Sequence, residues 1–208
     1  THLVVSTPKT VSVWQLQRIK NMKFNEEKLI ETARPLILKG RPGDWNHALR
    51  VVKWVKKLGK SRNDIPILIT SAYIHDIGWS GMWNSEKKVD LEVMLKLEHN
   101  ANRNTPVFIS EILNTLHYSR TEIEVVTRLV KAADNHESKS GDEAIIVDAD
   151  NLSKLSVEHV MEKYKTESYK DIVDKWENEF PNRIKTEEGK RTYLLLLEDL
   201  KIKLKLSN

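Results

Sequence analysis

Seven histidines and a group of acidic residues carry the chemistry that this chain could perform, because it has no cysteine. The most informative pair is His75-Asp76, which ends the most apolar run of the sequence. An unpaired carboxylate there would be costly to desolvate, so something must neutralise it. A divalent cation would do so, since imidazole and carboxylate are ligands of first-row metals. The alternative is that Asp76 pairs with a Lys or Arg, or caps the turn at Ile77-Gly78.

Two further segments supply residues of the same types. His47 lies beside the apolar stripe of a predicted helix, and Arg50 follows one turn later on much the same side. Downstream, four apolar residues lead into Asp148 and Asp150, and Asp150 could complete a set of two histidines and two aspartates. Alternatively, Asp148 caps a new helix and Asp150 lies in its first turn, where the helix dipole would stabilise both carboxylates.

The order of these residues resembles the HD-domain superfamily of metal-dependent phosphohydrolases, which is named for its adjacent His and Asp. The family pattern is a His, an HD pair and a distant Asp. Here it reads His47, then Ile74-His75-Asp76-Ile77-Gly78, then Ala149-Asp150-Asn151-Leu152, over about half of the chain. The resemblance implies that a divalent transition metal (Mn, Fe, Co, Ni or Zn) is bound by His47, His75, Asp76 and Asp150, with Asp148 in reserve for the last position.

A small branch of hydrolase-like relatives has extra histidines between the HD pair and the final Asp. Glu98-His99-Asn100-Ala101 is similar to the first of these positions, and Ala133-Asp134-Asn135-His136-Glu137 is similar to the second. In relatives these positions contact substrate phosphate or a second metal, so His99 and His136 are further site candidates. The alternative is that each histidine interacts with the carbonyl groups at a helix end.

The resemblance implies an enzyme that hydrolyses a phosphate ester or anhydride of a small molecule such as a nucleotide. A bound metal would polarise a phosphate oxygen and lower the pKa of a water, and that water would attack phosphorus. The catalytic residues expected are His75 and Asp76, with charge on the phosphoryl group stabilised by Arg50, His99 and His136. The alternatives are an HD-fold di-iron oxygenase, for which His99 and His136 would be extra ligands, and a non-catalytic binding or regulatory module.

Helices are expected to position these residues, because 7 Gly and 6 Pro in 208 residues leave few tight turns for a sheet protein. Caps and apolar spacing predict helices over residues 25–39, 44–58, 65–74, 89–102, 106–116, 121–135, 157–165, 167–180 and 186–206, although alternation leaves the state of 201–206 open. We expect an all-α, single domain over 1–208. Its HD-domain-like core of about five helices would span residues 44–155, with N-terminal helices 11–40 and C-terminal helices 156–206 packed on it.

Composition and charge limit the partners. With 39% hydrophobic and 31% charged residues, the chain is typical of a globular protein, and no apolar run reaches the ~20 residues of a membrane span. The net charge of +4 is weak evidence for nucleic acid, because the densest lysine cluster recurs at helical spacing as a solvated face. We therefore expect a cytoplasmic protein with a small phosphorylated substrate, and leave a homodimer open.

Overall fold

The computed structural model describes residues 24–84 and 86–206, and in these residues it contains helices and no strands. The prediction of an all-α fold is confirmed. Residues 11–23, which the sequence analysis assigned to N-terminal helices, lie outside the described residues. None of the described helices combines the length and the apolar character that a membrane span requires.

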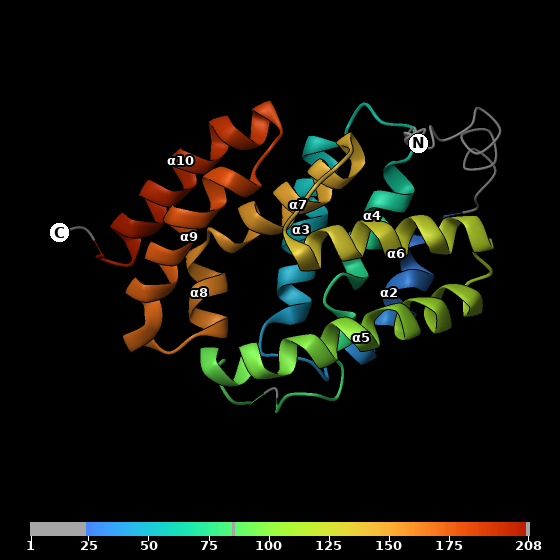
Figure 1. Ribbon diagram of the computed structural model, residues 1–208, viewed down its shortest axis with the longest axis horizontal. Coiled ribbons are helices and arrows are strands. Elements are labelled where there is room, and N and C mark those ends of the chain that lie inside the picture. Colours follow the sequence, from blue (N-terminus) through green and yellow to red (C-terminus); the bar gives the residue numbers. More distant parts are fainter. Residues whose placement is uncertain (1–23, 85, 207–208) are drawn as a thin grey trace, which may run out of the picture.

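The described residues form nine α-helices and two short 3₁₀ helices (Figure 1). In chain order these are α2 (Glu26–Ile37), α3 (Asp44–Leu58), α4 (Ile65–Ile74), η1 (Ile77–Trp79), α5 (Leu91–Thr115), α6 (Arg120–Asn135), α7 (Gly141–Lys154), α8 (Val157–Lys163), η2 (Thr166–Ser168), α9 (Tyr169–Arg183) and α10 (Glu187–Lys203).

Helices α3 and α7 lie at the centre of the molecule. They make the most extensive contact between any two helices, and α7 also contacts α4, α6, α8, α9 and α10. In Figure 1 they lie between α8, α9 and α10 on one side and α2, α4, α5 and α6 on the other. Side chains of α3, α4 and α7 can therefore meet although they are far apart in the sequence.

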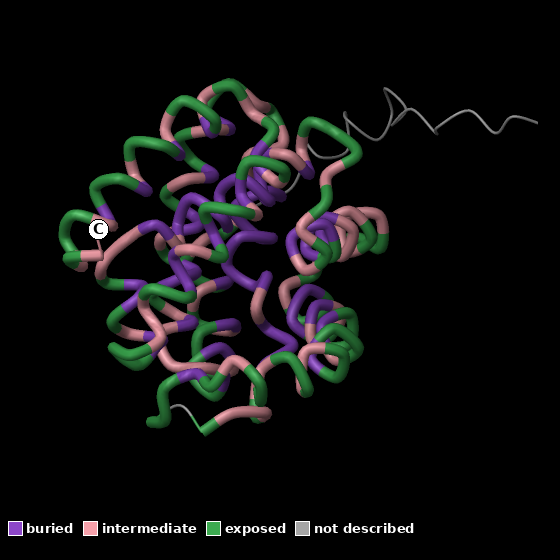
Figure 2. The backbone as a smooth tube through the Cα atoms, turned by 60° about the vertical axis from the view of Figure 1, so that its left-hand side comes forward, coloured by how far each residue is buried: buried purple, intermediate pink, exposed green. Residues whose placement is uncertain are grey.

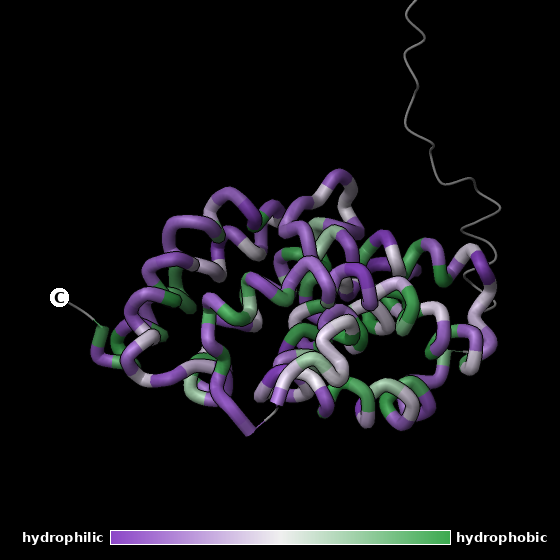
Figure 3. The backbone as a smooth tube through the Cα atoms, turned by 60° about the horizontal axis from the view of Figure 1, so that its bottom comes forward, coloured by the Kyte–Doolittle hydropathy of each residue, from purple (hydrophilic) through white to green (hydrophobic). Residues whose placement is uncertain are grey.

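Two hydrophobic clusters meet at α7. The first contains residues of every α-helix from α2 through α6 and of the middle of α7. It includes Leu68 and Ile146, both fully buried. The second joins the end of α7 to α8, α9 and α10 and includes Leu152 and Phe180. Buried residues lie on the inner sides of the helices (Figure 2). Hydrophobic and hydrophilic residues alternate in short stretches along the chain (Figure 3), as amphipathic helices require.

The apolar run that ends at the HD pair is helix α4, as predicted. Pro66 lies in its first turn, where a missing N–H removes no intrahelical hydrogen bond. Residues 67–74 are all buried, which explains why this segment shows no amphipathic periodicity in the sequence. A helix surrounded by protein on all sides fixes the position of the residues at its end, and these are His75 and Asp76.

One predicted helix boundary is wrong, and one segment that the sequence analysis left open is now assigned. The segments 89–102 and 106–116, predicted as separate helices, form the single helix α5 with Pro106 inside it. Pro106 and the residue four positions earlier, Asn102, are both exposed, so water can satisfy the carbonyl group that loses its N–H donor. The C-terminal alternation is helical, and α10 continues to Lys203.

Candidate metal centre

Helices α3, α4 and α7 bring together three of the four predicted metal ligands, His47, His75 and Asp150. The Nε2 atom of His47 lies 3.1 Å from Oδ1 of Asp150, and the Nε2 atom of His75 lies 3.7 Å from the same oxygen. One ligand atom from each residue lies within 4.8 Å of the other two, and all three side chains are buried. This cluster could bind a metal ion.

The hydrogen bonds of the two histidines determine which nitrogen carries the proton. Ser153 donates its hydroxyl proton to the carbonyl oxygen of Asp150, so its oxygen accepts from Nδ1–H of His47 at 3.0 Å. Nδ1 of His75 lies 2.9 Å from the carbonyl oxygen of Ala72, which can only accept, so this nitrogen is also protonated.

Both rings therefore present the lone pair of Nε2 to the cluster. Burial lowers the pKa of His47 to about 3, so its imidazole is neutral at physiological pH. Nε2 of His75 is buried and has no hydrogen-bond partner among the described residues. A histidine whose Nδ1–H is fixed by an oxygen acceptor and whose Nε2 is available has the arrangement of a metal ligand. The donor set of two imidazole nitrogens and a carboxylate oxygen fits a first-row transition metal.

Asp76, the fourth predicted ligand, lies beside the cluster and is already paired. Its Oδ2 atom lies 3.5 Å from Nε2 of His75 and 3.8 Å from Nε2 of His47, but only 2.6 Å from Nη2 of Arg41. Burial alone would raise the pKa of Asp76, but the positive charges of Arg41 and Lys163 outweigh it and keep the pKa well below its usual range. An arginine therefore neutralises this carboxylate, so the case for a metal depends on the histidines.

The acids of α7 point in different directions. Asp150 faces the histidines, and its second oxygen lies 2.6 Å from Nζ of Lys154. Asp148 accepts hydrogen bonds from the backbone N–H groups of Lys185 and Thr186 and from the hydroxyl of Thr186. It thereby anchors the segment that leads into α10. Both acids lie in the middle of α7 and not at its start, and only Asp150 is placed to bind a metal with the histidines.

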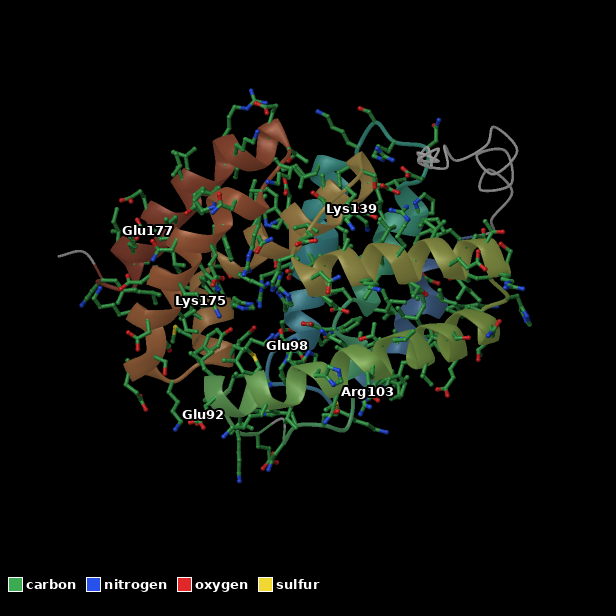
Figure 4. All side chains as sticks on the ribbon, viewed as in Figure 1. Glu92, Glu98, Arg103, Lys139, Lys175 and Glu177 are labelled. Carbon is green, nitrogen blue, oxygen red and sulfur yellow. The ribbon has the colours of Figure 1, made fainter. Side chains whose placement is uncertain are left out.

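A cavity of about 250 Å³ opens beside the cluster, where the two hydrophobic clusters meet. Lys175 of α9 and Glu98 of α5 reach it from opposite walls (Figure 4). Four histidines line it, together with five basic and five acidic residues: His47, His75, His136, His159, Arg41, Lys154, Lys163, Lys175, Arg183, Asp76, Glu98, Asp134, Asp150 and Glu179. The cavity is polar and carries charges of both signs next to the candidate metal ligands.

His136 lines this cavity, whereas His99 and Arg50 lie elsewhere. His136 ends α6 with φ of 54°, and burial lowers its pKa to about 4. His99 is exposed and is not among the described residues that line the cavity, because the helical turn from Glu98 directs it outward. Nη2 of Arg50 contacts Glu162 at 3.1 Å and Nδ1 of His159 at 3.3 Å, so Arg50 lies behind the cavity wall.

Asp134 and His159 are among the cavity residues that sequence reasoning missed. Asp134 lies two positions before His136, so its place beside a candidate histidine was a usable signal. Burial, together with the nearby charges of Asp76 and Asp150, raises the pKa of Asp134 to about 8. His159 is 1% exposed and its ring centroid lies 4.8 Å from that of His47. Its sequence context contains no signal, because the contact joins α8 to α3.

Comparisons with family models, with curated proteins and with solved structures found no match to this chain. The chemistry of the site is accordingly inferred from its donor atoms, its charges and the adjacent cavity.

Proposed function

We propose that this protein is an HD-type, metal-dependent phosphohydrolase that acts on a small phosphorylated molecule such as a nucleotide. The observation that carries the proposal is the convergence of two Nε2 lone pairs, from His47 and His75, on one carboxylate oxygen of Asp150. Two neutral acceptors and an anionic acceptor in contact are unfavourable without a cation between them. The order of these residues in the chain adds the resemblance to HD-domain enzymes.

The metal would be held by His47, His75 and Asp150, with Asp76 adjacent. When bound there, a divalent transition metal supplies Lewis acidity toward a phosphate oxygen and lowers the pKa of water. Ser153 and the carbonyl group of Ala72 keep the two imidazoles in the tautomer that this role needs.

The basic residues of the cavity suit an anionic substrate. Lys175 and Arg183 of α9 and Lys154 of α7 all line the cavity. Lysine and arginine side chains in a partly closed cavity stabilise phosphate charge more strongly than they would in bulk water. The volume of about 250 Å³ lies below the usual range of ligand pockets, which supports a small phosphorylated molecule and not a polymer.

Asp134 supplies the group that could protonate a leaving oxygen. With a pKa of about 8, its carboxyl group keeps a proton at neutral pH in the metal-free protein. A neutral carboxylic acid near the ionised Asp76 and Asp150 can act as a general acid, since ideal catalytic pKa values lie near the working pH. In this proposal Asp134 donates its proton to the alkoxide or phosphate that departs.

The test is the metal content of the full chain purified without chelator, compared with two histidine variants. We expect about one transition-metal ion per chain in the parent and in His99→Ala, whose side chain is exposed, and a loss of most of the metal in His75→Ala. Phosphate release from nucleoside monophosphates and from p-nitrophenyl phosphate should then follow the metal content. Equal metal in His75→Ala and the parent would contradict the site.

The di-iron oxygenase alternative has less support from the geometry than the hydrolase. It requires both extra histidines near the first metal, and His99 is exposed on the outer face of α5. Two irons per chain, retained in His75→Ala at half occupancy, would favour it over the mononuclear hydrolase.

A further inference from the structure

The contacts of His159 fix the position of its proton. Nη2 of Arg50 lies 3.3 Å from Nδ1 of His159 and also donates to Glu162 at 3.1 Å. A guanidinium group has only donors, so Nδ1 must be the acceptor and cannot carry a proton. The imidazole proton is therefore on Nε2, and His159 presents an N–H donor at that edge of its ring.

This N–H donor has no partner within the described chain. His159 is 1% exposed and its Nε2 atom is buried without a hydrogen bond. The ring packs between His47, at 4.8 Å between centroids, and Trp176, at 5.8 Å, and the residue lines the cavity. A buried donor without an acceptor is uncommon in folded proteins, and one at the wall of a cavity points to an acceptor that enters from outside.

The surroundings of His159 favour an anionic acceptor. Lys163 lies one turn further along α8 and Lys154 ends α7, and both lysines line the same cavity as His159. The candidate metal ligand His47 is its nearest aromatic neighbour. An oxygen that accepts from Nε2–H of His159 would therefore be close to the candidate metal as well.

We propose that His159 is a substrate-binding residue whose Nε2–H donates to an anionic oxygen of a phosphoryl group, with Arg50 as the positioning residue that fixes its tautomer. The inference rests on the proposed function for the identity of the anion. It gives a role to Arg50 that differs from the direct phosphate contact expected from the sequence. It also brings α8, which carries no catalytic motif, into the site.

The first measurement reads the tautomer directly. Long-range ¹H–¹⁵N correlation spectra of the uniformly ¹⁵N-labelled full chain distinguish Nε2–H from Nδ1–H imidazoles, and the His159→Gln spectrum assigns the signal. We expect the Nε2–H form for His159 in the parent, and a loss of that fixed tautomer in Arg50→Met. An Nδ1–H tautomer in the parent would overturn the inference.

The second measurement is the affinity of the metal-loaded protein for inorganic phosphate, determined by calorimetry. His159→Phe should bind phosphate roughly 10- to 100-fold more weakly, as expected for the loss of a hydrogen bond to a charged group. His159→Gln should stay within about threefold of the parent, because its amide nitrogen reaches the position of Nε2. His99→Phe is the matched control at an exposed histidine, and circular dichroism melting curves verify that each variant folds.

The outcomes separate this inference from the proposed function. Phosphate affinity that depends on His159, without hydrolysis of any phosphomonoester, would leave an oxyanion site and reject the phosphohydrolase. Hydrolysis by the parent with an unchanged KM and phosphate affinity in His159→Phe would keep the phosphohydrolase and reject the role of His159. The absence of phosphate binding to the metal-loaded parent would also reject the role of His159.

Discussion

Asp134 provides a direct test of the electrostatics of the cavity. It lies in the last turn of α6, where burial and the charges of Asp76 and Asp150 raise its pKa from 3.8 to about 8, against a smaller opposing effect of Arg41. The folded, metal-free protein thus keeps this proton through neutral pH, whereas the unfolded chain loses it near pH 4. Substitution by Asn preserves the size of the side chain and removes its titration.

The sign of the effect follows from the number of protons bound. Between about pH 4 and pH 8 the folded state binds this proton more tightly than the unfolded state, so the free energy of unfolding falls as the pH rises through that window. Each pH unit well inside the window corresponds to about 1.4 kcal/mol. From pH 5 to pH 8 the parent should therefore lose up to ~4 kcal/mol that Asp134→Asn does not lose.

The assay is urea denaturation of both proteins at pH 5, 6, 7 and 8 in the presence of a chelator. The other titrating groups are common to parent and variant and largely cancel in the difference. Asp199→Asn, at an exposed ion pair of α10, is the matched control and should show no growing difference. If the curves for Asp134→Asn and the parent run parallel from pH 5 to pH 8, Asp134 is ionised in the folded state and cannot be the proton donor.

Four further substitutions test metal binding and folding around the candidate site. Asp150→Asn should abolish metal binding in elemental analysis. Asp148→Ala should keep the metal but lose about 1–3 kcal/mol in urea denaturation, because it removes the acceptor of three partly buried donors. The reverse pattern would assign the ligand to Asp148. Gly78→Ala should lower the free energy of unfolding by about 3 kcal/mol, since its Cβ would clash with the backbone carbonyl oxygen of Ala101. A neutral effect would show that η1 and α5 can separate. Lys163→Met should cost about 1.5–3 kcal/mol, because it removes one of the two cations that pair with the buried Asp44, and an unchanged midpoint would mean that Arg41 alone is enough to stabilise this carboxylate.

Local sequence signals predicted most of the helices because each depends on residues close together in the chain. The apolar stripe of α3 and the capping residue before α2 are examples, and both helices form where predicted. The break expected at Pro106 is absent, because the exposed side of α5 lets water replace the lost hydrogen bond. Whether a proline interrupts a helix depends on tertiary exposure, which local sequence does not encode.

The residues of the candidate site could be predicted where their order along the chain indicates them. They could not be predicted where their position depends on the packing of helices. His47, His75 and Asp150 converge as their motif implies. The orientation of α5 about its own axis is set by packing against η1 and α6, and this directs Glu98 and not His99 to the cavity. The contact of His159 with His47 is likewise tertiary, since it joins α8 to α3, as the ion pairs Arg50–Glu162 and Lys163–Asp44 also do.

The charges buried around the ligands connect the metal site to an anionic substrate. Three carboxylates lie among three cations: Asp44 pairs with Lys163 and Arg41, Asp76 with Arg41, and Asp150 with Lys154. Within the described residues this network is balanced without a metal. A divalent cation between the histidines would give it a net positive charge in a medium where charge is poorly screened. An anion that enters the cavity restores the balance, so the same residues that could bind a metal also favour a phosphate beside it.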